Sequence, residues 1–113
     1  MTDKKTAPAF TVGSGNVFAD LGLPDAEELH LKASLVVEVK RLIAERDMTQ
    51  TAAAKLLAIS QPDLSKLLRG QLQLASVEKL MRMLTAFDQD IEIIIRPRRK
   101  RGEAGRITLV PAA

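Results

Sequence analysis

The stretch that most constrains the fold is residues 49–70, TQTAAAKLLAISQPDLSKLLRG, which reads as two short helices joined by a tight turn. Thr49 and Ser60 each precede a run of helix-forming residues. A hydroxyl at such a position accepts a hydrogen bond from an otherwise unpaired amide of the first helical turn. We therefore expect one helix directly after Thr49 and a second over residues 61–69. Gly70 then ends the second helix, because glycine adopts the left-handed backbone conformation without strain.

Only Ala58, Ile59 and Ser60 separate the two helices, which is too few residues to reverse the chain fully. The helices should therefore meet at a steep angle, as they do in a helix-turn-helix. Small residues let helices cross at close range, so Ala54 is the expected contact point. The expected apolar faces of the pair consist of Leu56, Leu57, Ile59, Leu64, Leu67 and Leu68.

The polar side chains on the outer face of the second helix can bond to base edges or phosphates. Gln61 can form a bidentate contact with an adenine edge and Lys66 can donate to guanine acceptors, so both are expected to read sequence in the major groove. Thr49, Gln50 and Arg69 are placed to hold phosphates. The full set of expected DNA-binding residues is Thr49, Gln50, Ser60, Gln61, Pro62, Asp63, Ser65, Lys66 and Arg69.

Two of these residues lie in the first turn of the second helix. Pro62 is tolerated there because its missing amide hydrogen would have no partner in the helix. Asp63 suits the positive end of the helix dipole and can also accept from a cytosine amino group. Because a carboxylate near phosphates is repelled, we rank the dipole role of Asp63 above base reading.

Residues 49–70 resemble the helix-turn-helix of the Xre family of phage-repressor-like regulators. The resemblance lies in the TQ start, Ala54, the apolar Ile59 in the turn, SQ at residues 60–61 and the closing L-L-x-G. Ala58 departs from the family pattern, which usually has glycine there. Because a non-glycine residue with positive φ is uncommon, we expect a slightly strained or differently shaped turn.

Composition narrows the classes of function that remain. The chain has 113 residues, which suits one domain, and it contains no cysteine and a single histidine, His30. His30 has no other metal-binding residue at ligand spacing, so we expect it on the surface. With so few general bases and nucleophiles, we expect no enzyme, metal or cofactor.

No segment is long and apolar enough to span a membrane, and no signal peptide is evident, so we expect a cytoplasmic protein.

The positive charge is concentrated near the C-terminus. The chain carries a net charge of +3, and residues 96–106 hold six basic residues and one acidic residue, which leaves −2 for the rest. Such a run is usually a solvated tail, and we expect residues 98–113 to be one. If DNA is nearby, the arginines of this basic run can instead neutralise DNA phosphates and strengthen binding without reading sequence.

The N-terminal part divides into two expected segments. Residues 1–14 lack helical or strand periodicity, so we expect a disordered tail. Residues 15–24 form an apolar arm that is too short and too interrupted by glycine to be a core element alone. The arm either folds over the first helix of its own chain or docks a partner protein. Its candidate partner-binding residues are Val17, Phe18, Leu21 and Leu23.

Residues 25–97 are the expected folded domain. Asp25 and Glu28 form a potential capping box, followed by an apolar stripe that predicts a long helix over residues 26–47. After a linker at residues 71–75, Ser76 is a third N-cap. The helix that follows has an apolar stripe made of Val77, Leu80, Met81, Leu84 and Phe87.

A short C-terminal strand is expected at residues 91–95, because Ile91, Ile93, Ile94 and Ile95 are β-branched. An unpaired apolar strand is prone to association, so it needs a partner. It can pair with residues 107–110 of its own chain, or with the same strand of a second subunit across a two-fold axis. We favour the homodimer, because helix-turn-helix proteins usually bind two half-sites about one helical turn apart.

The order of elements over residues 15–97 resembles the HigA-type antitoxin branch of the Xre family. The resemblance lies in the arm GNVFADLGLPDAEEL, the helix SQPDLSKLLRG and the strand DIEIIIRP. It implies an all-α, five-helix, lambda-repressor-like bundle with a short C-terminal strand. It also implies a homodimer that binds double-stranded operator DNA, represses its own operon and neutralises a RelE/HigB-like toxin. A stand-alone Xre-type repressor and a protein-interaction module with secondary DNA binding remain the alternatives.

Overall fold

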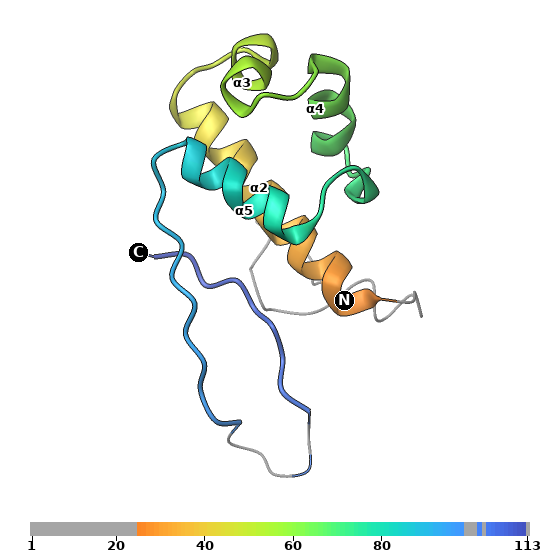
Figure 1. Cartoon of the computed structure of the whole chain (residues 1–113), viewed down its shortest axis with the longest axis vertical. Helices are drawn as coiled ribbons and strands as arrows, with labels where there is room; N and C mark the ends of the chain where they lie inside the picture. The colour runs from red at the N-terminus through yellow and green to blue at the C-terminus, as the bar shows by residue number, and fades with distance from the viewer. Residues whose placement is uncertain (1–24, 99–101, 103, 113) are drawn as a thin grey trace, which may run out of the picture.

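The computed structural model describes residues 25–98, 102 and 104–112. This part of the chain contains four α-helices, α2 (Ala26–Glu45), α3 (Gln50–Leu57), α4 (Gln61–Leu68) and α5 (Val77–Ala86), with the 3-10 helix η2 (Leu72–Leu74) between α4 and α5. Helices α2 and α5 lie against each other along the length of the bundle, and α3 and α4 lie together at one end of it (Figure 1). The expected helix pair of residues 49–70 is therefore formed by α3 and α4.

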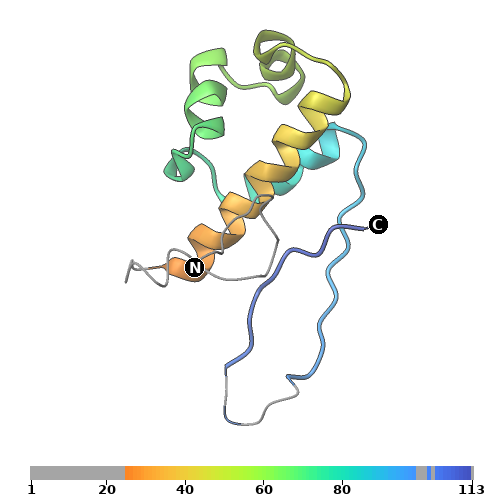
Figure 2. The same ribbon diagram turned by 180° about the vertical axis from the view of Figure 1, so that it is seen from behind.

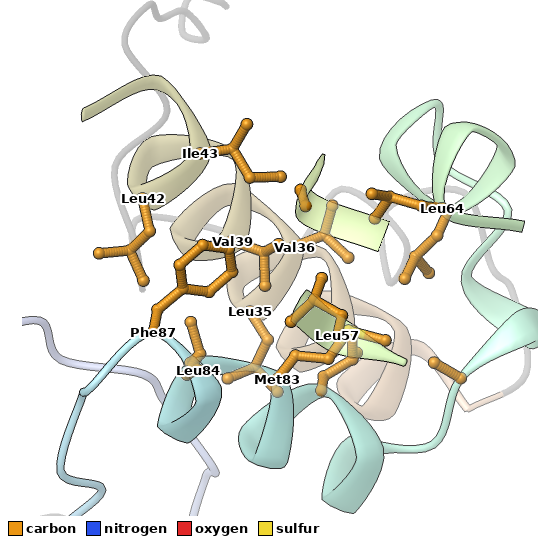
Figure 3. Packing of buried hydrophobic residues seen from close by; sticks show 14 of the residues in the cluster. Leu35, Val36, Val39, Leu42, Ile43, Leu57, Leu64, Met83, Leu84 and Phe87 are labelled. Atoms are coloured by element: carbon orange, nitrogen blue, oxygen red, sulfur yellow. The ribbon is translucent and has the colours of Figure 1, made fainter. Parts of the chain in front are cut away.

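The core lies where α2 and α5 meet the α3–α4 pair. Val39 of α2, Leu64 of α4 and Leu80 of α5 are fully buried, as is Phe87 directly after α5. Figure 3 shows Phe87 pointing from the end of α5 toward α2, with Leu57 and Leu64 contributing from the other side of the cluster. Because all four helices contribute to one core, α2 and α5 form a rigid support behind α3 and α4.

Two expectations about the fold are not supported in the described part of the single chain. This part has four α-helices rather than the five that the resemblance implies, and the linker at residues 71–75 contains the three-residue η2. Residues 91–95 are extended but form no strand, and no backbone hydrogen bond joins them to residues 107–110. A strand exists only through its ladder, so β-branched composition alone does not produce one.

The long helix α2 differs from expectation at both ends. Asp25 precedes it with a left-handed backbone, φ 56°, and forms no side-chain cap, so the capping box is absent. The helix ends at Glu45, two residues before the expected end at residue 47, because Asp47 adopts a φ of 52°. The amide of Met48 then donates to the carbonyl of Ile43 at 3.1 Å, which closes the turn into α3.

The positions expected for two side chains, His30 and Leu56, were wrong. His30 is 8% exposed rather than on the surface, because it lies one turn from Ser34 on the buried side of α2. The hydroxyl of Ser34 donates to the carbonyl of His30 at 3.0 Å. Leu56 was expected on the apolar face of α3 but is 41% exposed, since Ala53, Ala54 and Leu57 occupy that face.

Arg46 fastens the end of α2 to the point where the chain leaves α5. One guanidinium nitrogen, Nη2, donates to the carbonyl of Phe87 at 2.8 Å and to Oδ2 of Asp88 at 3.0 Å, and Cζ lies 5.2 Å from the centroid of the Phe87 ring. Residues 89–98 then extend away from α3 and α4, as both views show (Figures 1 and 2). On the returning segment the amide of Ile107 donates to Oε2 of Glu27 at 3.3 Å.

Several expectations concern residues that the structure does not describe. The N-terminal tail of residues 1–14, the apolar arm of residues 15–24 and the middle of the basic run, residues 99–101, lie outside the described residues. Within the described residues, no helix is both long and apolar enough to cross a membrane. No group of three or more His, Asp or Glu side chains in the same part of the chain is arranged to hold a metal ion.

Candidate nucleic-acid interface

Helix α3 begins at the expected cap. The Thr49 hydroxyl accepts from the amide of Ala52 at 3.1 Å, and Thr49 itself is extended, with φ −76° and ψ 161°. Behind the cap, Ala53 and Ala54 are buried. The small size of these two alanines lets the neighbouring helices approach closely, as expected for Ala54.

The turn between the helices is built around Ala58. Its backbone is left-handed, φ 59° and ψ 40°, which is the conformation that glycine normally supplies. The amide of Ala58 donates to the carbonyl of Lys55 at 3.3 Å, and the amide of Ile59 donates to that of Ala54 at 3.1 Å. An alanine in this conformation carries strain of about 1 kcal/mol, so the turn forms at a cost in stability.

Helix α4 is capped at both ends as the sequence predicted. The Ser60 hydroxyl accepts from the amide of Asp63 at 3.1 Å, and Pro62 lies in the first turn. At the other end Gly70 has a φ of 107°, and its amide donates to the carbonyl of Leu67 at 3.0 Å. The helix itself ends at Leu68, one residue earlier than expected.

The buried face of α4 determines which of its residues face solvent. Leu64 and Leu67 are 0% and 2% exposed, and they join the core that Ala53 and Leu57 of α3 also enter. The remaining positions point outward. Of the expected DNA-binding residues, Ser65 is half-buried and the others are exposed, namely Thr49, Gln50, Ser60, Gln61, Pro62, Asp63, Lys66 and Arg69. All of these residues thus lie on α3, on α4 or at the caps of these two helices.

A hydrogen bond joins the first residues of the two helices. Nε2 of Gln61 donates to Oε1 of Gln50 at 3.1 Å, with both side chains exposed. From the sequence, Gln50 was expected to contact a phosphate and Gln61 a base, with no contact expected between the two side chains. The available signal was the repetition of a hydroxyl cap followed by glutamine at the start of each helix, TQ and SQ.

Lys32 of α2 fixes the segment that follows α4. This lysine is only 8% exposed, and its Nζ donates to the carbonyl of Leu72 at 3.3 Å. The same nitrogen lies 3.4 Å from Oε2 of Glu28. Buried lysines are rare unless paired, so this contact holds η2, and with it the end of α4, against α2. Nothing in the sequence pattern pointed to Lys32, because its partner lies forty positions away.

Comparison with known proteins agrees with this geometry. A family model described as a helix-turn-helix domain matches residues 17–96. Among solved structures, a chain titled as a candidate XRE-family transcriptional regulator is 43% identical to this chain and has a TM-score of 0.73. The match covers 79% of this chain and 100% of that one. The chain belongs to the Xre family of helix-turn-helix regulators. No curated protein matches this Xre-family chain.

Because the chain belongs to the Xre family, it is a DNA-binding transcriptional regulator, and DNA is its partner. The expected homodimer residues Ile91, Ile93, Ile94 and Ile95 are exposed in the single chain. The expected partner-binding residues Val17, Phe18, Leu21 and Leu23 lie outside the described residues. In this Xre-type regulator the α3–α4 surface is thus the site that the structure defines in atomic detail.

Proposed function

We propose that this Xre-type regulator reads its operator by placing the N-terminal end of α4 in the major groove, as a homodimer on two half-sites. The observation that carries the proposal is the exposed Gln61 held by Gln50 at the junction of α3 and α4. The buried leucines of α4 and the caps at Thr49 and Ser60 support it, because they fix the helix that presents Gln61.

Gln61 keeps the groups that adenine recognition needs. One amide hydrogen of its Nε2 is donated to Gln50, which leaves the second amide hydrogen and the carbonyl oxygen. Those two groups match the N7 acceptor and the N6 donor of adenine in the major groove. The bond to Gln50 therefore orients the Gln61 carboxamide without using the atoms that contact the base.

The other residues of the surface divide into readers and positioning groups. Lys66, one turn or more from the helix start, donates to guanine acceptors. Thr49 and Gln50 at the amide end of α3, together with Arg69 after α4, hold phosphates and set the position of the domain on the duplex. The backbone amide of Asp63 donates to the Ser60 hydroxyl, and the Asp63 carboxylate serves the helix dipole first.

Replacing Gln61 or Lys66 with alanine tests the reading roles. Each change should weaken binding to the protein's own promoter region by about 1–3 kcal/mol while leaving binding to random duplex nearly unchanged. Binding can be measured by fluorescence anisotropy at one fixed salt concentration. Gln73→Ala and Lys79→Ala are matched controls, because both side chains are exposed and lie outside the α3–α4 pair.

Two outcomes would count against this assignment. Equal losses on specific and random duplex would make Gln61 and Lys66 phosphate contacts rather than readers. Losses of the same size in the Gln73 and Lys79 controls would remove the special role of α4 altogether.

We further propose that this regulator is the antitoxin of a type II toxin–antitoxin pair, and that it neutralises a RelE/HigB-like toxin and represses its own operon. The support is the resemblance of residues 15–24, GNVFADLGLP, and of the element order that follows them to HigA-type antitoxins. A stand-alone repressor is the second candidate. It is supported by the solved relative, which is described as a candidate XRE-family transcriptional regulator.

The arm provides the test between these two roles. The double change Phe18→Ala with Leu21→Ala should abolish capture of a RelE-like protein encoded beside this gene and leave operator binding and the melting temperature near those of the parent. The matched control is Leu56→Ala with Leu74→Ala, which removes two exposed leucines of the folded domain. If the parent protein captures no such neighbour and no small toxin gene adjoins it, the antitoxin role fails and the stand-alone repressor stands.

A further inference from the structure

The extended segment of residues 90–98 has the sequence DIEIIIRPR. Its acidic residues precede Ile94, and its basic residues follow Ile94 at the same spacings. In an extended chain, odd and even residues lie on opposite faces. The odd positions carry Ile91, Ile93, Ile95 and Pro97. The even positions carry, in order, Asp90, Glu92, Ile94, Arg96 and Arg98. One face is therefore apolar, and the other runs from two acids through a central isoleucine to two arginines.

Most of this segment is exposed in the single chain. Ile93, Ile94 and Ile95 are 77%, 69% and 91% exposed, which is unusual for three consecutive isoleucines. Within the described part of the chain, no backbone hydrogen bond joins residues 90–96 to another segment. An extended apolar segment with unpaired backbone groups is a template for pairing with another chain.

We propose that residues 90–98 pair antiparallel with the same residues of a second copy of this chain, across a two-fold axis at Ile94. This inference rests on the homodimer of the proposed function and gives it a register. In this register Glu92 lies opposite the partner's Arg96, and Asp90 lies opposite the partner's Arg98. Ile94 lies opposite the partner's Ile94. Each charge pair occurs twice because of the two-fold symmetry.

The charge pattern excludes the neighbouring arrangements. A parallel pairing in register would place Glu92 against the partner's Glu92, and like charges directly opposite each other are destabilising. Moving the antiparallel axis to Ile93 would place Glu92 opposite the partner's Ile94. Moving it to Ile95 would place Ile94 opposite the partner's Arg96. Only the axis at Ile94 matches every acid with a base and every isoleucine with an apolar residue.

The apolar face gains from the same register. Ile93 lies opposite the partner's Ile95, so the two copies together form a continuous row of isoleucines on one side of the ribbon. Pro97, which has no amide hydrogen to donate, falls near the end of the pairing, where proline is tolerated. The segment leads away from α3 and α4 in both views, so this contact leaves the DNA-reading surface uncovered (Figures 1 and 2).

Charge exchange at residues 92 and 96 tests the register on the full chain without DNA. Glu92→Arg alone and Arg96→Glu alone each place like charges opposite each other, so each should raise the dimer dissociation constant about tenfold or more. The two variants mixed in equal amounts should associate with each other, because every opposed pair is then complementary. The double variant E92R/R96E should regain the affinity of the parent. Analytical ultracentrifugation measures all four.

The control for these variants is Lys79→Glu, a charge reversal at an exposed position on α5. It should leave the dimer unchanged. The register is wrong if E92R and R96E dimerise as tightly as the parent, or if mixing them does not restore association. A parent protein that stays monomeric at concentrations of about 100 µM would overturn the pairing itself, since even a weak specific homodimer is populated there.

Single cysteines give a second, geometric readout, because the chain has no cysteine of its own. Directly opposed residues in an antiparallel pair have Cα atoms about 4.5–5.5 Å apart, within disulfide range. Ile94→Cys should therefore cross-link to its own copy under mild oxidation, whereas Ile93→Cys and Ile95→Cys should each cross-link poorly alone and well with each other. Preferred self-linking of Ile93→Cys or Ile95→Cys would overturn the proposed axis.

These measurements separate the pairing from the DNA function on which it builds. A chain that cross-links through Ile94→Cys but binds no operator would disprove the proposed function and leave the pairing intact. A dimer that binds operator and cross-links at another position would keep the function and disprove the register.

Discussion

The helical body of residues 25–88 and the extended segment of residues 89–98 are both rich in aliphatic side chains, yet they use them in opposite ways. In the body, Val39 and Phe87 are fully buried. In the extended segment, Ile95 is 91% exposed. A helix bonds its own backbone and needs neighbours only for its side chains, whereas an extended segment needs a second one for its backbone as well. The helical body thus satisfies its backbone hydrogen bonds and buries its side chains within one chain, whereas the extended segment needs a second segment to do so.

The largest expected contrast comes from truncating one apolar side chain in each region. Phe87→Ala should lower the free energy of unfolding by about 3–5 kcal/mol, because it empties the contact between α2 and α5. Ile95→Ala should change it by no more than about 0.5 kcal/mol, measured by urea denaturation at a concentration where the chain is monomeric. Similar losses for both changes would mean that the extended segment is packed within its own chain.

A smaller effect is expected at the junction of the two regions. Arg46→Ala removes the contact with the Phe87 ring and the hydrogen bonds to Phe87 and Asp88, so it should cost about 1–2 kcal/mol. Amide hydrogen exchange should accelerate around residues 87–90. Arg82→Ala is the control, since it breaks only an exposed pair with Glu78, and it should cost less than about 0.5 kcal/mol. If the two changes cost the same, Arg46 is an ordinary surface residue.

The smallest expected effect is a gain. Ala58→Gly should raise the free energy of unfolding by about 0.5–1 kcal/mol, because glycine relieves the left-handed strain at the turn. The control Ala52→Gly, at an exposed position inside α3, should instead lower it by about 1 kcal/mol. Thermal unfolding of both variants measures the difference. A loss at position 58 would show that the turn carries no strain.

The sequence predicted the parts of the molecule that depend on local chemistry. Thr49, Ser60 and Ser76 all cap helices through their hydroxyls, and Gly70 ends α4 with a positive φ, as expected. Caps and glycine ends involve residues three or four positions apart, so a pattern in the sequence is enough to find them. The outward face of α4 followed from the same spacing argument.

What the sequence missed depends on contacts between distant residues. Lys32 bonds to a carbonyl forty positions away and Gln50 to a side chain eleven positions away, and neither separation leaves a periodic signal. The expected strand failed for the same reason, because its formation depends on a pairing partner rather than on isoleucine content. The Asp25 cap failed because Asp25 has a left-handed backbone instead of the extended one that capping residues usually adopt.

A substitution at Gln50 changes the surroundings of Gln61, and a substitution at Gln61 changes those of Gln50. When either side chain is replaced, the other loses the group it was bonded to and becomes free to adopt other rotamers. The effects of substitutions at the two positions should therefore be strongly non-additive in a double-mutant cycle. A descendant of this protein with a new operator preference would reach it most easily through paired substitutions at positions 50 and 61. A library designed for that purpose should randomise both codons together.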